Sequence, residues 1–104
     1  MLVAGFLMAE TLSDAIERND LAQARRLLLA GADPDAVVIE DFTPLGYCAT
    51  TGRTGFVALL LEFGANPGHR DRQGRSAADY ARARGHHAIA ELIAKAQRGV
   101  ARRR

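Results

Sequence analysis

Four side chains in this sequence belong to types that carry chemistry in proteins: the thiol of Cys48 and the imidazoles of His69, His86 and His87. A thiolate beside a histidine can act as a nucleophile, and grouped histidines can hold a zinc ion. Cys48, however, stands where the surrounding apolar pattern requires a small buried residue, which favours a packed and inert thiol. His86 and His87 are adjacent, and adjacent side chains on a helix point apart. We therefore expect no catalytic residue and no metal site.

The sequence also lacks the short motifs that mark many enzymes and cofactor-binding proteins. A glycine-rich phosphate loop, the HExxH of zinc proteases, a CxxC pair and a GxSxG nucleophile turn are all missing. The 104 residues suffice for one domain, and 48% apolar with 25% charged residues is typical of a soluble globular protein. The single cysteine excludes an internal disulfide. We expect a cytoplasmic protein without enzyme activity and without a cofactor.

One pattern of eight residues occurs twice in the chain. LLLAGADP covers residues 27–34 and LLEFGANP covers residues 60–67, so the two copies are 33 residues apart. The same offset relates the small residues Ala15, Cys48 and Ala81, which are expected where neighbouring helices press together. A period of this length indicates a repeat protein whose units stack to bury a shared core. Three units result, at about residues 10–37, 38–70 and 71–97.

Each unit has the signals of two helices joined by a tight turn. In the middle unit Thr43 is suited to cap the first helix, and Pro44 takes the first helical position, where its missing N–H costs nothing. Gly52 separates the two helices, and the equivalent residue of the first unit is Asn19, which tolerates a positive φ. Gly64 is suited to a left-handed cap after the second helix. The first helices are predicted near residues 11–18, 44–51 and 77–84, and the second helices near 20–30, 53–63 and 86–96.

The stretch DFTPLGYCATTGRTGFVALLLEFGANP resembles the ankyrin repeat, whose pattern has T-P-L-H-x-A, a glycine between helices and L-L-x-x-G-A-D. The likeness covers residues 11–96. It implies an all-α, ankyrin-repeat solenoid of stacked helix–turn–helix units with short hairpin loops. One domain over residues 11–97 would follow an apolar lead-in at 1–10, too short to span a membrane, and precede a basic tail at 98–104. Gly46 stands where the repeat usually has its histidine.

The resemblance implies a binding surface for a partner protein, formed by the hairpin tips and the exposed side of the first helices. The first hairpin, DAVVIEDF, is apolar and irregular where the ankyrin pattern is polar. An exposed apolar cluster often marks an interface, although an irregular hairpin can also fold down and bury its side chains. Tyr47 and Tyr80 occupy equivalent positions and are expected to pack between repeats. The candidates from this hairpin and the nearby concave side are Val37, Ile39, Glu40, Phe42, Thr50 and Thr51.

Arginines dominate the second hairpin and the helix that follows it. Guanidinium groups pair with carboxylates through a fork of N–H donors, so a partner with an acidic surface is expected. The alternative is a polyanion or nucleic-acid binder, but no aromatic residues are interleaved with the arginines to stack on bases, so nucleic acid is not the expected partner. A solvated charged face is the default for such a run. The candidates here are Arg70, Arg72, Gln73, Arg75 and Arg84.

The two halves of the chain carry opposite charge. Residues 1–52 hold eight acidic and three basic residues, a net charge of −5, whereas residues 53–104 hold four acidic and eleven basic residues, a net charge of +7. In a linear stack of repeats this places opposite charges at the two ends, which favours weak head-to-tail contact. Because exposed charges are screened beyond about 8 Å at physiological ionic strength, we expect a monomer there and self-association only at low salt.

Overall fold

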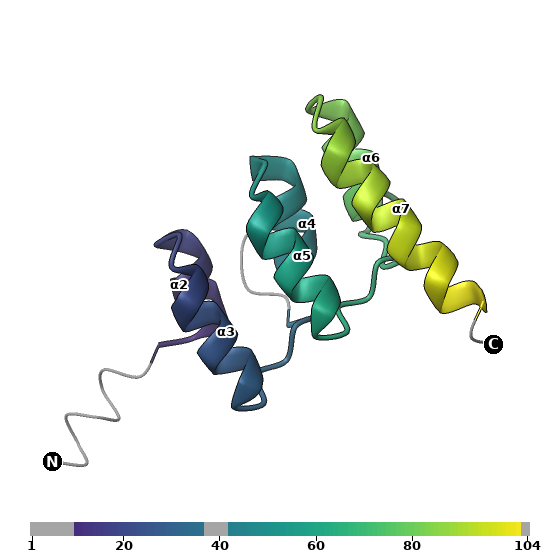
Figure 1. The fold of residues 1–104 in the computed structure, drawn as a ribbon. Coiled ribbons are helices and arrows are strands. Elements are labelled where there is room, and N and C mark those ends of the chain that lie inside the picture. The colour runs from purple at the N-terminus through teal and green to yellow at the C-terminus, as the bar shows by residue number, and fades with distance from the viewer. Residues whose placement is uncertain (1–9, 37–41, 103–104) are drawn as a thin grey trace, which may run out of the picture.

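The computed structural model describes residues 10–36 and 42–102, and the helices in these ranges form three helix–turn–helix pairs (Figure 1). The pairs stand side by side in chain order, in a particle of 46 × 29 × 24 Å. Between described residues there is an isolated antiparallel bridge that joins Arg70 and Ser76. The prediction of an all-α repeat solenoid is confirmed. The first helices are α2 (Leu12–Glu17), α4 (Pro44–Thr51) and α6 (Ala77–Ala83), and the second helices are α3 (Leu21–Leu29), α5 (Thr54–Glu62) and α7 (His87–Arg102).

The first helix of each pair begins at a capping hydroxyl. Thr11, Thr43 and Ser76 each accept a hydrogen bond from the backbone N–H three residues later, which satisfies a donor that the helix itself leaves unpaired. Thr43 and Ser76 are 33 residues apart, as the repeat predicts, and Pro44 follows at the first helical position. The first pair departs by one residue because its cap is Thr11, so α2 starts slightly later than the offset requires.

The turn between the two helices of each pair uses a left-handed residue at the same place in all three units. Asn19 has a φ of 61°, Gly52 of 75° and Gly85 of 79°. A side chain in this region clashes with its own backbone, which is why glycine is preferred and asparagine is the usual substitute. The prediction for Asn19 is confirmed.

Small and branched apolar side chains fill the space between the pairs. Ala15, Cys48 and Ala81 are completely buried, and they let α4 lie against α6 and contact α2. First and second helices both supply the core, and the second helices contribute Leu60 of α5 at 1% exposure and Ile93 of α7 at 0%. α5 packs against α4 within its own pair and against α3 and α7 on its two sides. The core is therefore continuous through the middle repeat, as a stacked solenoid requires.

The last helix is longer than the sequence analysis predicts. It was expected to end near residue 96, but α7 continues to Arg102, so the boundary predicted at residue 97 between domain and basic tail lies inside a helix. In the first two units the second helix is followed by a glycine with positive φ, Gly31 or Gly64, which begins the pattern GAxP. The third unit lacks this pattern. Gly99 alone does not stop the helix, since one internal glycine costs only about 1 kcal/mol.

Candidate functional site

The second hairpin, which joins α5 to α6, presents a cluster of arginines on a backbone held by many hydrogen bonds. We call its residues 69–76 the arginine hairpin. Arg70 and Ser76 form the antiparallel bridge, and the N–H of Asp71 donates to the carbonyl of Arg75 at 3.0 Å. At the tip the N–H of Gly74 donates to the carbonyl of Asp71 at 2.9 Å, with Gly74 at a φ of 79°. The turn therefore has the left-handed residue that such a tight reversal needs.

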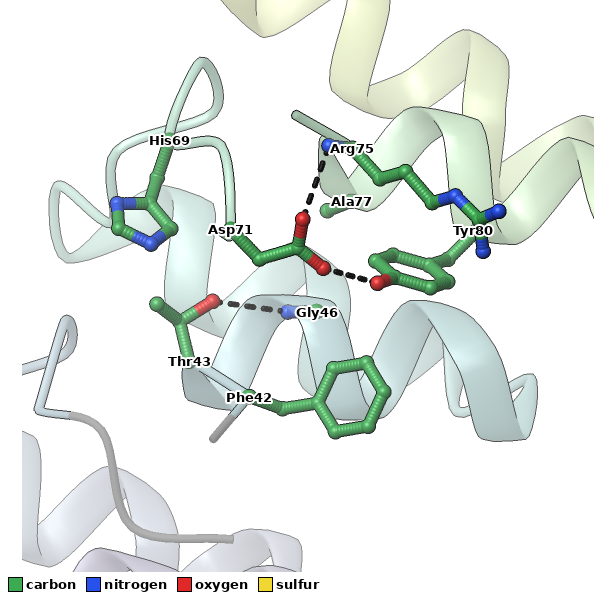
Figure 2. A pocket seen from close by; sticks show the side chains of 8 residues that line it. All are labelled: Phe42, Thr43, Gly46, His69, Asp71, Arg75, Ala77 and Tyr80. Carbon is green, nitrogen blue, oxygen red and sulfur yellow. Dashed lines mark hydrogen bonds between the residues drawn. The ribbon is translucent and has the colours of Figure 1, made fainter. Parts of the chain in front are cut away.

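The carboxylate of Asp71 organises this hairpin from inside. Its Oδ1 accepts the backbone N–H of Gln73 at 2.9 Å and that of Arg75 at 3.0 Å. Its Oδ2 accepts the hydroxyl of Tyr80, which reaches back from α6 (Figure 2). The Tyr80 hydrogen bond, with those from the backbone, lowers the pKa of Asp71, and the same bond raises the pKa of the Tyr80 phenol. At neutral pH an ionised carboxylate therefore ties the hairpin to the helix behind it.

The arginine hairpin points its long side chains outward from this rigid base. Arg70, Arg72, Gln73 and Arg75 are all exposed. Arg70 donates from Nη1 to the carbonyl of Gly74 at 2.8 Å, and the guanidinium of Arg75 lies 6.0 Å from the centre of the Tyr80 ring. Contacts of this kind restrict the side chains before any partner arrives, so less conformational entropy is lost on binding.

Phe42 lies between two repeats rather than at an exposed hairpin tip. Its ring is half-buried and meets the ring of Tyr80 edge to face, with centres 5.2 Å apart and planes at 72°. This contact confirms that Tyr80 packs across repeats, and the pairing of its hydroxyl with Asp71 is an addition that the sequence analysis missed. The partner-binding role of Phe42 stays a prediction. Val37, Ile39 and Glu40 lie outside the described residues.

The other candidates lie at the far ends of the first helices. Thr50 and Thr51 belong to the last turn of α4, where their hydroxyls donate to the carbonyls of Gly46 at 2.8 Å and Tyr47 at 2.9 Å. Arg84 is exposed just after α6, at the position equivalent to Thr51 in the next repeat. Since α6 has seven residues, Arg84 lies about 10 Å along the helix from the arginine hairpin. The structure thus divides the candidates into two groups at opposite ends of α4 and α6.

The groups suited to chemistry are not assembled into a reactive site. Cys48 is completely buried, and burial raises the pKa of its thiol to about 12, with the charge of Arg53 opposing only part of the increase. The thiol is therefore protonated at neutral pH and is a poor nucleophile. His86 is half-buried against Gly52, while His69 and His87 are exposed. Across residues 10–36 and 42–102 no three metal-binding side chains are grouped, and no helix is long and apolar enough to cross a membrane.

The sequence is similar to several known proteins over most of its length. A family model described as ankyrin repeats in three copies matches residues 12–102. Over 91 residues, 86% of this chain, the sequence is 36% identical to ARF GTPase-activating protein GIT1 of Homo sapiens and 33% identical to GIT2 of Mus musculus. Over 64 residues, 62% of this chain, it is 42% identical to ankyrin repeat and SOCS box protein 16 of Mus musculus. The aligned stretches cover only 12% to 14% of these relatives.

Proposed function

We propose that this chain, which belongs to the ankyrin repeat family, binds a partner protein through the arginine hairpin and the exposed side of α4 and α6. Ankyrin repeats generally mediate protein–protein interaction, and the family is typically non-enzymatic. Two of these relatives are named GTPase-activating proteins, but the matched stretch is only 12% to 13% of their length. That activity is therefore no part of the proposal.

The observation that carries the proposal is the rigid presentation of the arginine hairpin. A loop whose backbone is fixed by Asp71 and tied to Tyr80 does not have to become ordered when a partner binds. Its outward residues are long, exposed and not needed for the core. Binding is the function that such a surface supports best.

Charge indicates what kind of partner the surface fits. Between residues 70 and 84 the chain has two acidic residues, and both are occupied internally. Asp71 accepts the three hydrogen bonds described above. Asp79 accepts the N–H of Ser76 at 3.0 Å in a capping box, and it also pairs with Arg82 at 3.2 Å and with Arg70 at 3.6 Å. The Ser76 N–H is the main reason that the pKa of Asp79 is lowered. With five arginines against two carboxylates, the same stretch keeps a net charge of +3, which favours an acidic protein surface.

A polyanion such as nucleic acid is the second candidate, because the same arginines could neutralise phosphates. The structure provides little for base stacking, since Tyr80 is half-buried and its ring already contacts Phe42 and Arg75. We therefore favour the protein partner. The proposal includes a cytoplasmic location, consistent with the one cysteine being a free and buried thiol, and a monomeric state at physiological salt.

Removing the hairpin arginines should abolish partner capture without unfolding the protein. In the variant Arg70→Ala/Arg72→Ala/Arg75→Ala, we expect recovery of specific partners by affinity purification and quantitative mass spectrometry to fall about tenfold or more. The matched control is Arg26→Ala/Lys95→Ala/Arg98→Ala, which removes the same charge from exposed positions on α3 and α7. The control should retain its partners, and circular dichroism should match the wild type for both variants.

Two outcomes would count against the protein partner. If partner recovery fell equally in the hairpin variant and in the control variant, net charge and not the arginine hairpin would determine capture. The polyanion would be favoured instead if the wild type bound heparin or mixed DNA at physiological salt. That binding should then fall steeply as salt rises and be lost in the hairpin variant.

A further inference from the structure

Tyr80 reaches from α6 to the inside of the arginine hairpin. Its hydroxyl donates to Oδ2 of Asp71, and Oδ1 of the same carboxylate accepts the backbone N–H groups of Gln73 and Arg75 (Figure 2). Because the two oxygens belong to one planar group, a hydrogen bond that holds Oδ2 also keeps Oδ1 directed at the turn. The Tyr80 hydroxyl therefore acts on the backbone that carries the arginines, although it lies on a different element.

The ring of Tyr80 makes contacts that do not depend on its hydroxyl. It meets the Phe42 ring edge to face, with centres 5.2 Å apart, and the guanidinium of Arg75 lies 6.0 Å from its centre. A phenylalanine at position 80 would keep an aromatic ring for both contacts and would lose only the hydroxyl. One substitution thus separates the packing between repeats from the hydrogen bond to the hairpin.

The middle repeat provides an internal comparison. Tyr47 is the residue equivalent to Tyr80, 33 positions earlier, and its ring also lies beside a guanidinium, with Arg53 5.6 Å from the ring centre. The residue equivalent to Asp71 is Val38, whose side chain has no hydrogen-bond acceptor. The aromatic ring therefore recurs in both repeats, whereas the bond from a tyrosine to a turn carboxylate is particular to the arginine hairpin.

We propose that Tyr80 is a positioning residue for partner binding, whose hydroxyl holds the arginine hairpin in its binding conformation without contacting the partner. The partner binds the exposed arginines of the turn that Asp71 and Tyr80 keep closed. Without the hydroxyl the turn opens more often, and a partner that binds only the closed turn is bound more weakly in proportion to the closed fraction that is lost. This inference rests on the proposed function, because it names what controls the affinity of the same surface.

Hydrogen-exchange NMR on the free protein gives the first test. In Tyr80→Phe the opening of the turn, measured at the amides of Gln73 and Arg75, should increase about tenfold, because hydrogen bonds to charged groups are among the stronger ones. Tyr47→Phe removes the same atom from the equivalent residue and should leave both rates unchanged. Circular dichroism should match the wild type for both variants. Unchanged exchange in Tyr80→Phe would overturn the proposal.

A synthetic peptide serves as the probe for the second test. It is selected by phage display on the wild type at physiological salt and counter-selected against Arg70→Ala/Arg72→Ala/Arg75→Ala, so that its binding requires the hairpin arginines. Tyr80→Phe should bind this peptide about three- to tenfold more weakly, and by no more than the increase in opening measured by exchange. Equal affinity would contradict the positioning role. A loss of affinity larger than the increase in opening would show that the hydroxyl contacts the peptide, which would also overturn the proposal.

The selection also separates this inference from the proposed function. If every selected peptide binds the triple arginine variant as well as the wild type, the arginine hairpin is not a binding surface, and the proposed function fails together with this inference. If a peptide requires the arginines but binds Tyr80→Phe and the wild type equally, only the role of Tyr80 is refuted.

Discussion

Replacing Leu60 by alanine should lower the free energy of unfolding by about 2–5 kcal/mol. Leu60 is 1% exposed and lies on α5 of the middle repeat, which packs against α4, α3 and α7. A cavity at this point removes contacts that join all three repeats into one core, and the neighbouring helices cannot close it without shifting. Because small domains have only about 5–15 kcal/mol of stability, the loss is a large fraction of the total.

Leu29→Ala is the matched control for this substitution. It removes the same atoms, but Leu29 is 68% exposed at the end of α3, so the free energy of unfolding should change by no more than about 0.5 kcal/mol. Urea unfolding followed by circular dichroism measures both variants against the wild type. Coincident midpoints for Leu60→Ala and the wild type would show that the core is wrongly placed.

Replacing Gly52 by alanine should be the next most damaging of the changes considered. The residue has a φ of 75°, a conformation that costs an ordinary residue about 1–2 kcal/mol. Its new Cβ would also lie 2.9 Å from Cε1 of His86 in the following repeat, so the imidazole would have to move. The expected loss in the free energy of unfolding is about 2–3 kcal/mol, the sum of a backbone cost and a disturbed contact between repeats.

Gly85→Ala separates these two costs. Gly85 has nearly the same φ, 79°, but nothing lies within 4 Å of the Cβ that it would gain, so only the backbone cost applies. Thermal or urea unfolding should therefore rank Gly52→Ala as less stable than Gly85→Ala. In a His86→Ala background the difference between the two glycine substitutions should shrink. If the two single variants unfold together, the contact with His86 contributes nothing to stability.

The repeat architecture was predictable because its signals are local in the sequence. A capping hydroxyl, a proline at the first helical position and a glycine with positive φ each act within one turn of the chain, as at Thr43, Pro44 and Gly52. Each signal is weak alone, but the same signals recur 33 residues apart, and this recurrence strengthens the prediction of a repeat protein. The predicted end of α7 was wrong because the third unit lacks the local stop signal that follows the second helix in the other two units.

The candidate site was harder to predict because it depends on contacts between distant residues. Asp71 and Gly74 fit the usual turn of the repeat, but the hydrogen bond from Tyr80 and the packing of Phe42 on Tyr80 arise only when two repeats stack. An aspartate in a short turn, followed nine residues later by a tyrosine on a helix, is too weak a sequence signal to predict the hydrogen bond between them.

Site-specific photo-crosslinking tests the central claim most directly, namely that a partner protein binds on the side of the arginine hairpin and the first helices. A photoreactive amino acid would replace Gln73 of the hairpin, Thr51 of α4 or, as the control, Lys95 of α7, each of which is exposed. After irradiation in cells, nuclease treatment and mass spectrometry, we predict the same protein adduct from positions 73 and 51 and none from position 95. An adduct formed from position 95 alone, or adducts that disappear with nuclease, would contradict the account.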